Sequence, residues 1–358
     1  MKAAAAELVF IPSPGMGHLV STVEMAKQLI VRDHRLSITV LIMKTPFDKS
    51  KVVSTTQSLL LKAAEDRLKF VELPQDDEAA AAVAEFRSKN AGNFMSEFVN
   101  MNKPHVRDHV TKMMASTESG RLAGFVIDMF CTPMMDVAAE FGLPTYAFLT
   151  SNCAFLGLIF HLDTLSRNQD VTELKDSDAE LEVSVFVNPV PAKVLPGVVL
   201  HKEGGSKLML GVAKRLRETK GIMVNTFEEL ESYAVKRLAE DDMVPPIYPV
   251  GPVLHLVKYE KEEDEEVREI AQALEQSKHR FLWSLRQPPP EGKIEMPNEI
   301  ENGIQRLMEN WDKSSTEGIK QKVKEMSEKS KVAIKEGGSS YNSIGRFIED
   351  VIINVHSS

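Results

Sequence analysis

The chain has 358 residues, of which 43% are hydrophobic and 27% are charged, as in ordinary soluble globular proteins. Its formal net charge of −9 argues against nucleic acid and anionic membranes as main partners. The two cysteines, Cys131 and Cys153, give neither a disulfide framework nor a metal-binding spacing, and the first residues do not resemble a secretory signal peptide. We therefore expect a cytoplasmic protein of two domains, with no metal, no cofactor, no nucleic-acid partner and no transmembrane segment.

Short apolar runs alternate with stretches whose apolar residues recur at helical spacing. Strands are predicted at residues 7–11, 36–43, 68–71, 124–127 and 145–149, and helices at 18–32, 48–65, 78–88, 94–114, 133–141 and 154–165. After a proline-rich connection, the pattern predicts a helix at 208–220, a strand at 221–225, a helix at 226–238 that opens on a Thr226–Glu229 capping box, and a last strand within 245–252. Such alternation predicts an α/β fold whose parallel sheet carries helices on both faces.

The turn after the first predicted strand contains two glycines and places His18 in the first turn of a helix, in residues 11–19 (IPSPGMGHL). The partial positive charge of a helix N-terminus favours a neutral imidazole, which can accept a proton. His18 is therefore a candidate general base, although it could instead only cap the helix. A dinucleotide-binding turn is disfavoured, because Val20 stands where the third glycine belongs and the next strand runs into Lys44 rather than an acid.

Polar residues follow other predicted strands as well. Asp128 comes directly after the strand at 124–127, and Thr150 directly after the strand at 145–149. Ligands of parallel α/β sheets bind beyond the carboxyl ends of the strands, so we expect His18, Asp128 and Thr150 on one rim. Asp128 has a second interpretation, as a cap of the helix that starts near Pro133.

The pattern changes after residue 251, where we place a domain boundary. The segment 252–340 shows a single clear strand, at 280–285, and the remaining residues, 341–358, form a C-terminal helix. One strand cannot pair its own backbone groups, so this second domain looks incomplete, and the strand could pair with a second copy of the chain.

Six ordered segments resemble the plant UDP-dependent glycosyltransferases of secondary metabolism. They are residues 11–19 (IPSPGMGHL), 125–131 (FVIDMFC), 221–231 (GIMVNTFEELE), 248–252 (YPVGP), 279–286 (HRFLWSLR) and 336–340 (EGGSS). The resemblance implies a GT-B architecture of two facing Rossmann-like halves, an acceptor-binding half at 1–251 and a donor-binding half after it. It also implies inverting transfer of a sugar, typically glucose from UDP-glucose, to a hydroxyl of a flavonoid, phenolic, terpenoid or hormone. By position, His18 is then the base, Asp128 orients its ring, and Thr150 contacts the donor sugar.

The resemblance places the acceptor pocket near Gly17, Phe94, Phe130 and Phe155, with Met95 beside them. These side chains are mostly apolar and suit a flat phenolic or terpenoid alcohol, although each could equally be a core residue.

The family's donor box is absent from the sequence. That box combines a Trp-x-Pro-Gln segment, a His-Cys-Gly-Trp-Asn-Ser turn and an acid-Gln pair, which hold the nucleoside, the diphosphate and the sugar. The donor half therefore looks truncated by internal deletion, UDP-sugar binding is doubtful, and we expect activity to be lost or strongly impaired. Three hypotheses remain: a truncated, inactive gene product, a transferase whose donor site is built elsewhere, and a non-catalytic protein that binds small molecules in the acceptor cleft.

Overall fold

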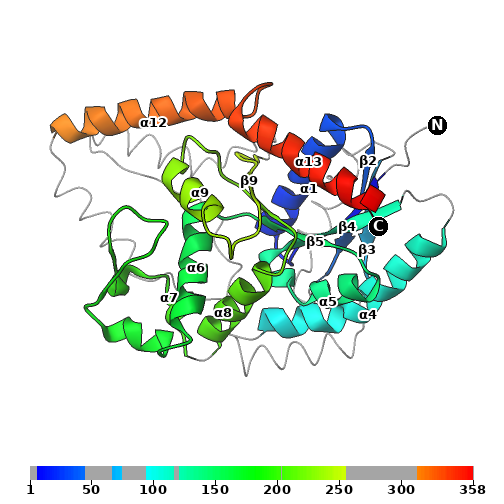
Figure 1. Ribbon diagram of the computed structural model, residues 1–358, viewed down its shortest axis with the longest axis horizontal. Helices are drawn as coiled ribbons and strands as arrows, with labels where there is room; N and C mark the ends of the chain where they lie inside the picture. The colour runs from blue at the N-terminus through cyan, green and yellow to red at the C-terminus, as the bar shows by residue number, and fades with distance from the viewer. Residues whose placement is uncertain are drawn as a thin grey trace, which may run out of the picture. The chain divides into compact units, whose positions relative to one another are not determined.

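A computed structural model describes residues 6–44, 67–74, 94–116, 121–202, 204–254 and 313–357 (Figure 1). Within these ranges, the residues up to 254 and those from 329 onward form one compact unit, whereas 313–328 belong to a second unit. The predicted helices at 48–65 and 78–88 and the predicted strand at 280–285 lie outside the described residues. The domain boundaries at 251 and 340 stay predictions.

A sheet of seven parallel strands organises the first unit, in the order β3-β2-β1-β4-β5-β8-β9. Its strands are β1 (Ala6–Ile11), β2 (Leu36–Ile42), β3 (Leu68–Glu72), β4 (Arg121–Asp128), β5 (Thr145–Leu149), β8 (Ile222–Val224) and β9 (Ile247–Pro249). The expected parallel α/β fold is confirmed. From β1 the sheet continues to β2 and β3, and from β4 it continues in the opposite direction to β5, β8 and β9. The carboxyl ends of β1 and β4 therefore form a topological switch point, where ligands of such sheets bind.

Helices connect and cover the strands. They are α1 (Met16–Arg32), α4 (Phe94–Ala115), α5 (Met134–Glu140), α6 (Cys153–Leu165), α7 (Gly197–Leu200), α8 (Gly205–Leu216), α9 (Ser232–Ala239), α12 (Lys313–Ala333) and α13 (Ser339–Ser357), with 3-10 turns η1 (Met129–Cys131), η2 (Val171–Asp176) and η3 (Ala192–Val194). The proline-rich connection carries a small antiparallel ribbon of β6 (Glu180–Leu181) and β7 (Val190–Pro191). No helix in the described ranges has both the length and the apolarity that crossing a membrane requires.

Strand β1 is apolar at consecutive positions because both faces of the sheet are covered there. Leu8 and Phe10 join the core on one face of the sheet, together with α1 and α13, whereas Val9 and Ile11 join the core on the other face, with α4, α5, α6 and α8. All four side chains are buried, as expected for a parallel strand that is covered on both sides.

Helix α13, near the end of the sequence, packs against the same sheet as α1 (Figure 1). Phe347 is fully buried between two tyrosines of the sheet, edge-on to Tyr146 at 5.2 Å and to Tyr248 at 5.5 Å between ring centroids. The Tyr248 hydroxyl donates to the Asp350 carboxylate, and Asn354 Nδ2 donates to the Tyr146 hydroxyl at 2.8 Å. The helix therefore completes one face of the N-terminal sheet with both apolar and polar contacts.

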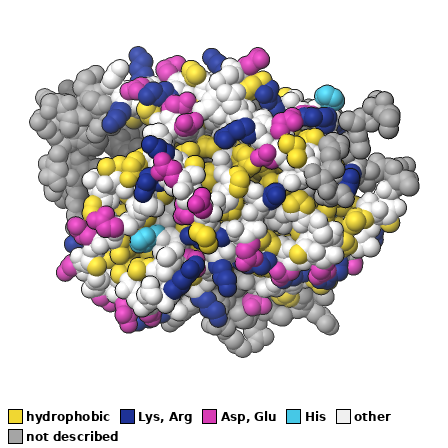
Figure 2. Space-filling model, viewed as in Figure 1, with side chains coloured by type: hydrophobic (Ala, Val, Ile, Leu, Met, Phe, Trp, Pro, Cys, Tyr) yellow, Lys and Arg dark blue, Asp and Glu magenta, His cyan; other side chains and the backbone are white. Residues whose placement is uncertain are grey.

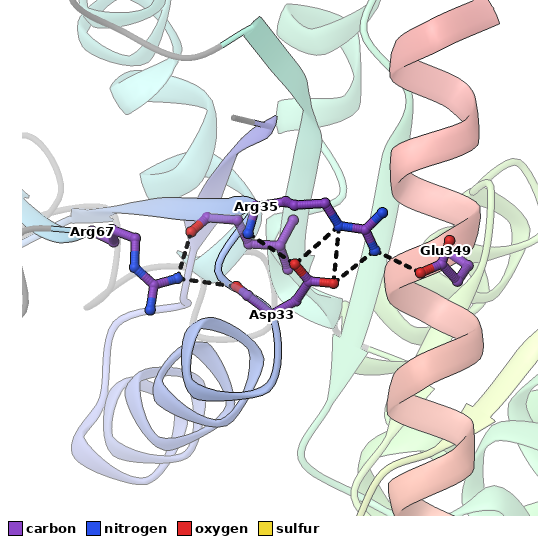
Figure 3. Close-up of polar contacts among 5 residues, drawn as sticks. Asp33, Arg35, Arg67 and Glu349 are labelled. Carbon is purple, nitrogen blue, oxygen red and sulfur yellow. Dashed lines mark hydrogen bonds and ion pairs between the residues drawn. The ribbon is translucent and has the colours of Figure 1, made fainter. Parts of the chain in front are cut away.

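A polar cluster ties the turn after α1 to α13 (Figure 3). The Arg35 guanidinium donates to Asp33 Oδ2 at 2.7 Å and to Glu349 Oε1 at 2.6 Å, so it bridges the turn and the helix. Arg67 donates to the backbone carbonyls of Asp33 and Leu36 at 3.0 Å. Glu349 is well exposed, so water screens its ion pair, and the cluster fixes geometry more than it stabilises the fold.

The helix predicted at 226–238 is present but begins six residues later, and its predicted capping box is wrong. Helix α9 begins at Ser232, and residues 225–231 form a loop instead. The Thr226 hydroxyl is buried and has no hydrogen-bond partner among the described residues, while Glu229 accepts a hydrogen bond from Ser339 Oγ at 2.8 Å. Tertiary contacts of this loop with neighbouring elements outweigh the local capping signal.

Candidate active site

The turn between β1 and α1 sets the position of His18. Gly15 is the N-cap of α1 and has φ of 127°, a backbone conformation that residues with a Cβ rarely adopt. The helix starts at Met16, and the Leu19 N–H donates to the Gly15 carbonyl at 3.0 Å. His18 therefore lies in the first turn of the helix, just past the carboxyl end of β1, as predicted.

Asp128 is the last residue of β4, the strand that neighbours β1. Its side chain is fully buried and uses both oxygens: Oδ2 lies 2.7 Å from His18 Nδ1, and Oδ1 accepts from the Phe130 N–H at 3.0 Å. The capping interpretation of Asp128 is thus correct for the 3-10 turn η1 rather than for α5. Because the backbone N–H fixes one oxygen, the other faces the imidazole in a defined direction.

The charge of Asp128 reverses the electrostatic expectation for His18. The hydrogen bond that the Asp128 carboxylate accepts from the His18 ring raises the pKa of His18 above its ordinary value, and partial burial of the ring opposes this rise only in part. The helix N-terminus, which favours the neutral form, is therefore not the dominant influence. The side chain remains 28% exposed, so Nε2 can be reached from solvent while Nδ1 faces the carboxylate.

The other predicted residues are distributed around this pair. Thr150 follows β5, whose Phe148 is paired in register with Asp128, so Thr150 lies two residues past that level on the adjacent strand. Phe130 packs edge-on against the His18 ring, with 5.7 Å between centroids. Gly17 is exposed and has open space around its Cα.

The two remaining aromatic candidates do not contact His18 in any described interaction. Phe94 stacks on Phe98 within α4 at 6.0 Å between ring centroids, and Phe155 lies in the first turn of α6. Both are partly buried against the apolar core on that face of the sheet, as is Met95. Among the aromatic candidates, Phe130 is the one whose ring contact with His18 is described.

Sequence reasoning missed Glu231, the residue before α9. Its carboxylate accepts the backbone N–H groups of Cys153 and Ala154, at 2.9 and 3.0 Å, and so caps helix α6. An acidic residue just before a helix is normally interpreted as a cap of that same helix, and no local pattern indicates a partner 78 residues away.

Charge on the visible surface is mixed rather than of one sign: Figure 2 shows Lys and Arg interspersed with Asp and Glu. The described residues contain no group of three or more His, Cys, Asp or Glu side chains that could hold a metal ion.

Two curated relatives cover most of the chain. The UDP-glucose flavonoid 3-O-glucosyltransferase 6 of Fragaria ananassa is 48% identical over an alignment of 336 residues, and the match covers 82% of this chain and 68% of that protein. The UDP-glycosyltransferase 71E1 of Stevia rebaudiana is 44% identical over an alignment of 342 residues, and the match covers 87% of this chain and 69% of that protein. The chain belongs to the plant UDP-glycosyltransferases.

Solved structures of plant UDP-glycosyltransferases share the fold. The Medicago truncatula UGT71G1 complexed with UDP-glucose has a TM-score of 0.72 and 28% identity, and the match covers 97% of this chain and 98% of that one. A transferase from Siraitia grosvenorii in complex with UDP has the same TM-score and identity, and the match covers 97% of this chain and all of that one. No family model matches the chain. The GT-B fold class inferred from the six sequence segments is confirmed by these relatives.

Proposed function

We propose that this UDP-glycosyltransferase chain carries the base of an inverting sugar transfer, from UDP-glucose to a hydroxyl of a small plant metabolite. The observation that carries the proposal is the 2.7 Å contact between His18 Nδ1 and Asp128 Oδ2 at the switch point of the sheet. The family relationship supports the donor and acceptor classes, because relatives are named as flavonoid glucosyltransferases and a similar structure holds UDP-glucose.

The geometry supports a separate role for each nitrogen of the ring. With Nδ1–H donating to Asp128, the lone pair of Nε2 is free to accept the proton of the acceptor hydroxyl. The acceptor oxygen then bonds to the anomeric carbon as the bond from that carbon to UDP breaks on the opposite face, which inverts the configuration. Asp128 stabilises the imidazolium that results, and the proton later leaves to solvent. In this scheme Thr150 contacts the donor sugar, and Gly17, Phe94, Phe130 and Phe155 border the acceptor.

The sequence lacks the donor box that other members of the family use, so we propose that the chain as it stands transfers sugar weakly or not at all. UDP-glucose carries two negative charges, and the further charge that builds on the departing UDP has to be stabilised by hydrogen-bond donors and a helix N-terminus. Loss of a single such donor typically lowers the rate by about 10²–10³. The loss of several donors together is therefore expected to remove measurable activity.

A second candidate function follows from the same contrast. The His18–Asp128 pair and its rim are present while the donor box is absent from the sequence, which favours a protein that binds a small hydroxylated molecule without glycosylating it. The two functions differ in their affinity for UDP.

Calorimetry with UDP and UDP-glucose tests the proposal, on the full chain and on the same chain with the donor box restored from a relative. We expect binding and acceptor glucosylation only in the restored chain, and loss of glucosylation in its His18→Ala variant. His34→Ala, which removes an exposed histidine after α1, is the matched control and should retain activity. Micromolar UDP binding by the unrestored chain would show that its donor site has been rebuilt, and a restored chain that never glucosylates would refute the catalytic proposal.

A further inference from the structure

The start of helix α6 is capped by a side chain from a distant loop. Glu231 accepts from Cys153 N and Ala154 N at 2.9 and 3.0 Å, and the N-cap Asn152 accepts from Phe155 N through Oδ1 at 2.8 Å. The N–H groups of the first three residues of α6 are thereby all paired. A free helix N-terminus is an anion site, but here the protein's own carboxylate occupies it.

The same loop also holds the other side of the turn that precedes α6. The Asn225 N–H donates to the Leu149 carbonyl, the last residue of β5, at 2.9 Å. The loop 225–231 therefore contacts the chain immediately before and immediately after the turn 150–152. Because both flanks are fixed by one segment, the turn has little freedom to move along the rim.

We propose that Glu231 is a positioning residue for sugar transfer, because it holds the turn that presents Thr150 beside Asp128. This inference rests on the proposed function, in which Thr150 contacts the donor sugar. Glu231 does not touch the reacting atoms; its carboxylate acts through the two backbone N–H groups of α6. Hydrogen bonds from backbone N–H groups to a carboxylate are stronger than those to a neutral capping side chain, and two of them together also fix the direction of the contact.

Hydrogen–deuterium exchange on the full chain measures the positioning directly. In Glu231→Gln, one acceptor and the negative charge are lost, and we expect the amides of Cys153 and Ala154 to exchange about tenfold faster or more. Glu231→Ala should increase the rate further, and the exposed Glu228→Gln, which makes the same charge change three residues away, should not alter it. Equal exchange in Glu231→Gln and wild type would overturn the inference.

Kinetics on the restored chain test whether positioning acts through Thr150. We expect Glu231→Gln to lower kcat/KM for UDP-glucose by about tenfold with an unchanged KM for the acceptor, and to have no further effect in a Thr150→Ala background. An equal loss in both backgrounds would overturn the route through Thr150. If the restored chain with no further substitution never transfers sugar, the proposed function fails, and the exchange result still decides whether Glu231 fixes the turn.

Discussion

Replacement of Phe347 by alanine tests whether α13 belongs to the N-terminal folding unit. The side chain is fully buried, and removing a buried phenylalanine typically costs about 3–5 kcal/mol. Its two edge-on contacts, with Tyr146 and Tyr248, place the expected loss toward the upper part of that range. We expect the free energy of unfolding, measured by urea titration and far-ultraviolet circular dichroism, to fall by about 4 kcal/mol.

The same helix offers a matched control. Ile353 is 58% exposed, so Ile353→Ala should change the free energy of unfolding by less than about 0.5 kcal/mol. If Phe347→Ala were as mild as this control, the packing of α13 on the sheet would contribute nothing to the stability of the unit, and our account of its core would be wrong.

Three further measurements address the site and the backbone. Asp128→Asn should lower the pKa of His18, as measured by NMR titration. Because the pKa of His18 is raised in the folded state, its pairing with Asp128 stabilises the fold fully only below the ordinary pKa of 6.5. The loss of stability in this variant should therefore become smaller as the pH rises through the folded-state pKa. Gly124→Ala should lower the thermal midpoint, because φ is +147° and a Cβ would lie 2.6 Å from a backbone carbonyl, whereas Gly211→Ala in open space on α8 should not. Burial raises the pKa of Cys153, so native protein should resist its alkylation at pH 8, and rapid modification would contradict the buried position.

The parts of the fold that the sequence predicts are those with local signals. Apolar runs place most of the strands to within a few residues, because strands buried on both faces carry few polar positions. The pairing of His18 with Asp128 follows from the same logic, since both come directly after parallel strands and β1 and β4 are neighbours. Chain order and the rule for switch points are enough to bring them together.

The contacts that sequence reasoning misses are those with no local signal. Glu231 caps a helix far away in the sequence, and Thr226 and Glu229 lie in a loop, where Glu229 accepts from Ser339 instead of closing a capping box. The apolar stripe of α13 predicts a helix but does not indicate which surface it covers. These features depend on the assembled tertiary structure, where burial and charge pairing outweigh helix propensity.

The return of α13 to the N-terminal sheet has a consequence for synthesis on the ribosome. Residues 6–254 supply the seven strands of the described sheet, yet the part of its face around Tyr146 and Tyr248 lacks its contacts with α13 until residues 339–357 have emerged. At about 5–20 residues per second, this interval lasts several seconds. During that time the nascent sheet exposes an apolar surface that a chaperone can recognise, so the yield of folded protein depends on events after the sheet has formed.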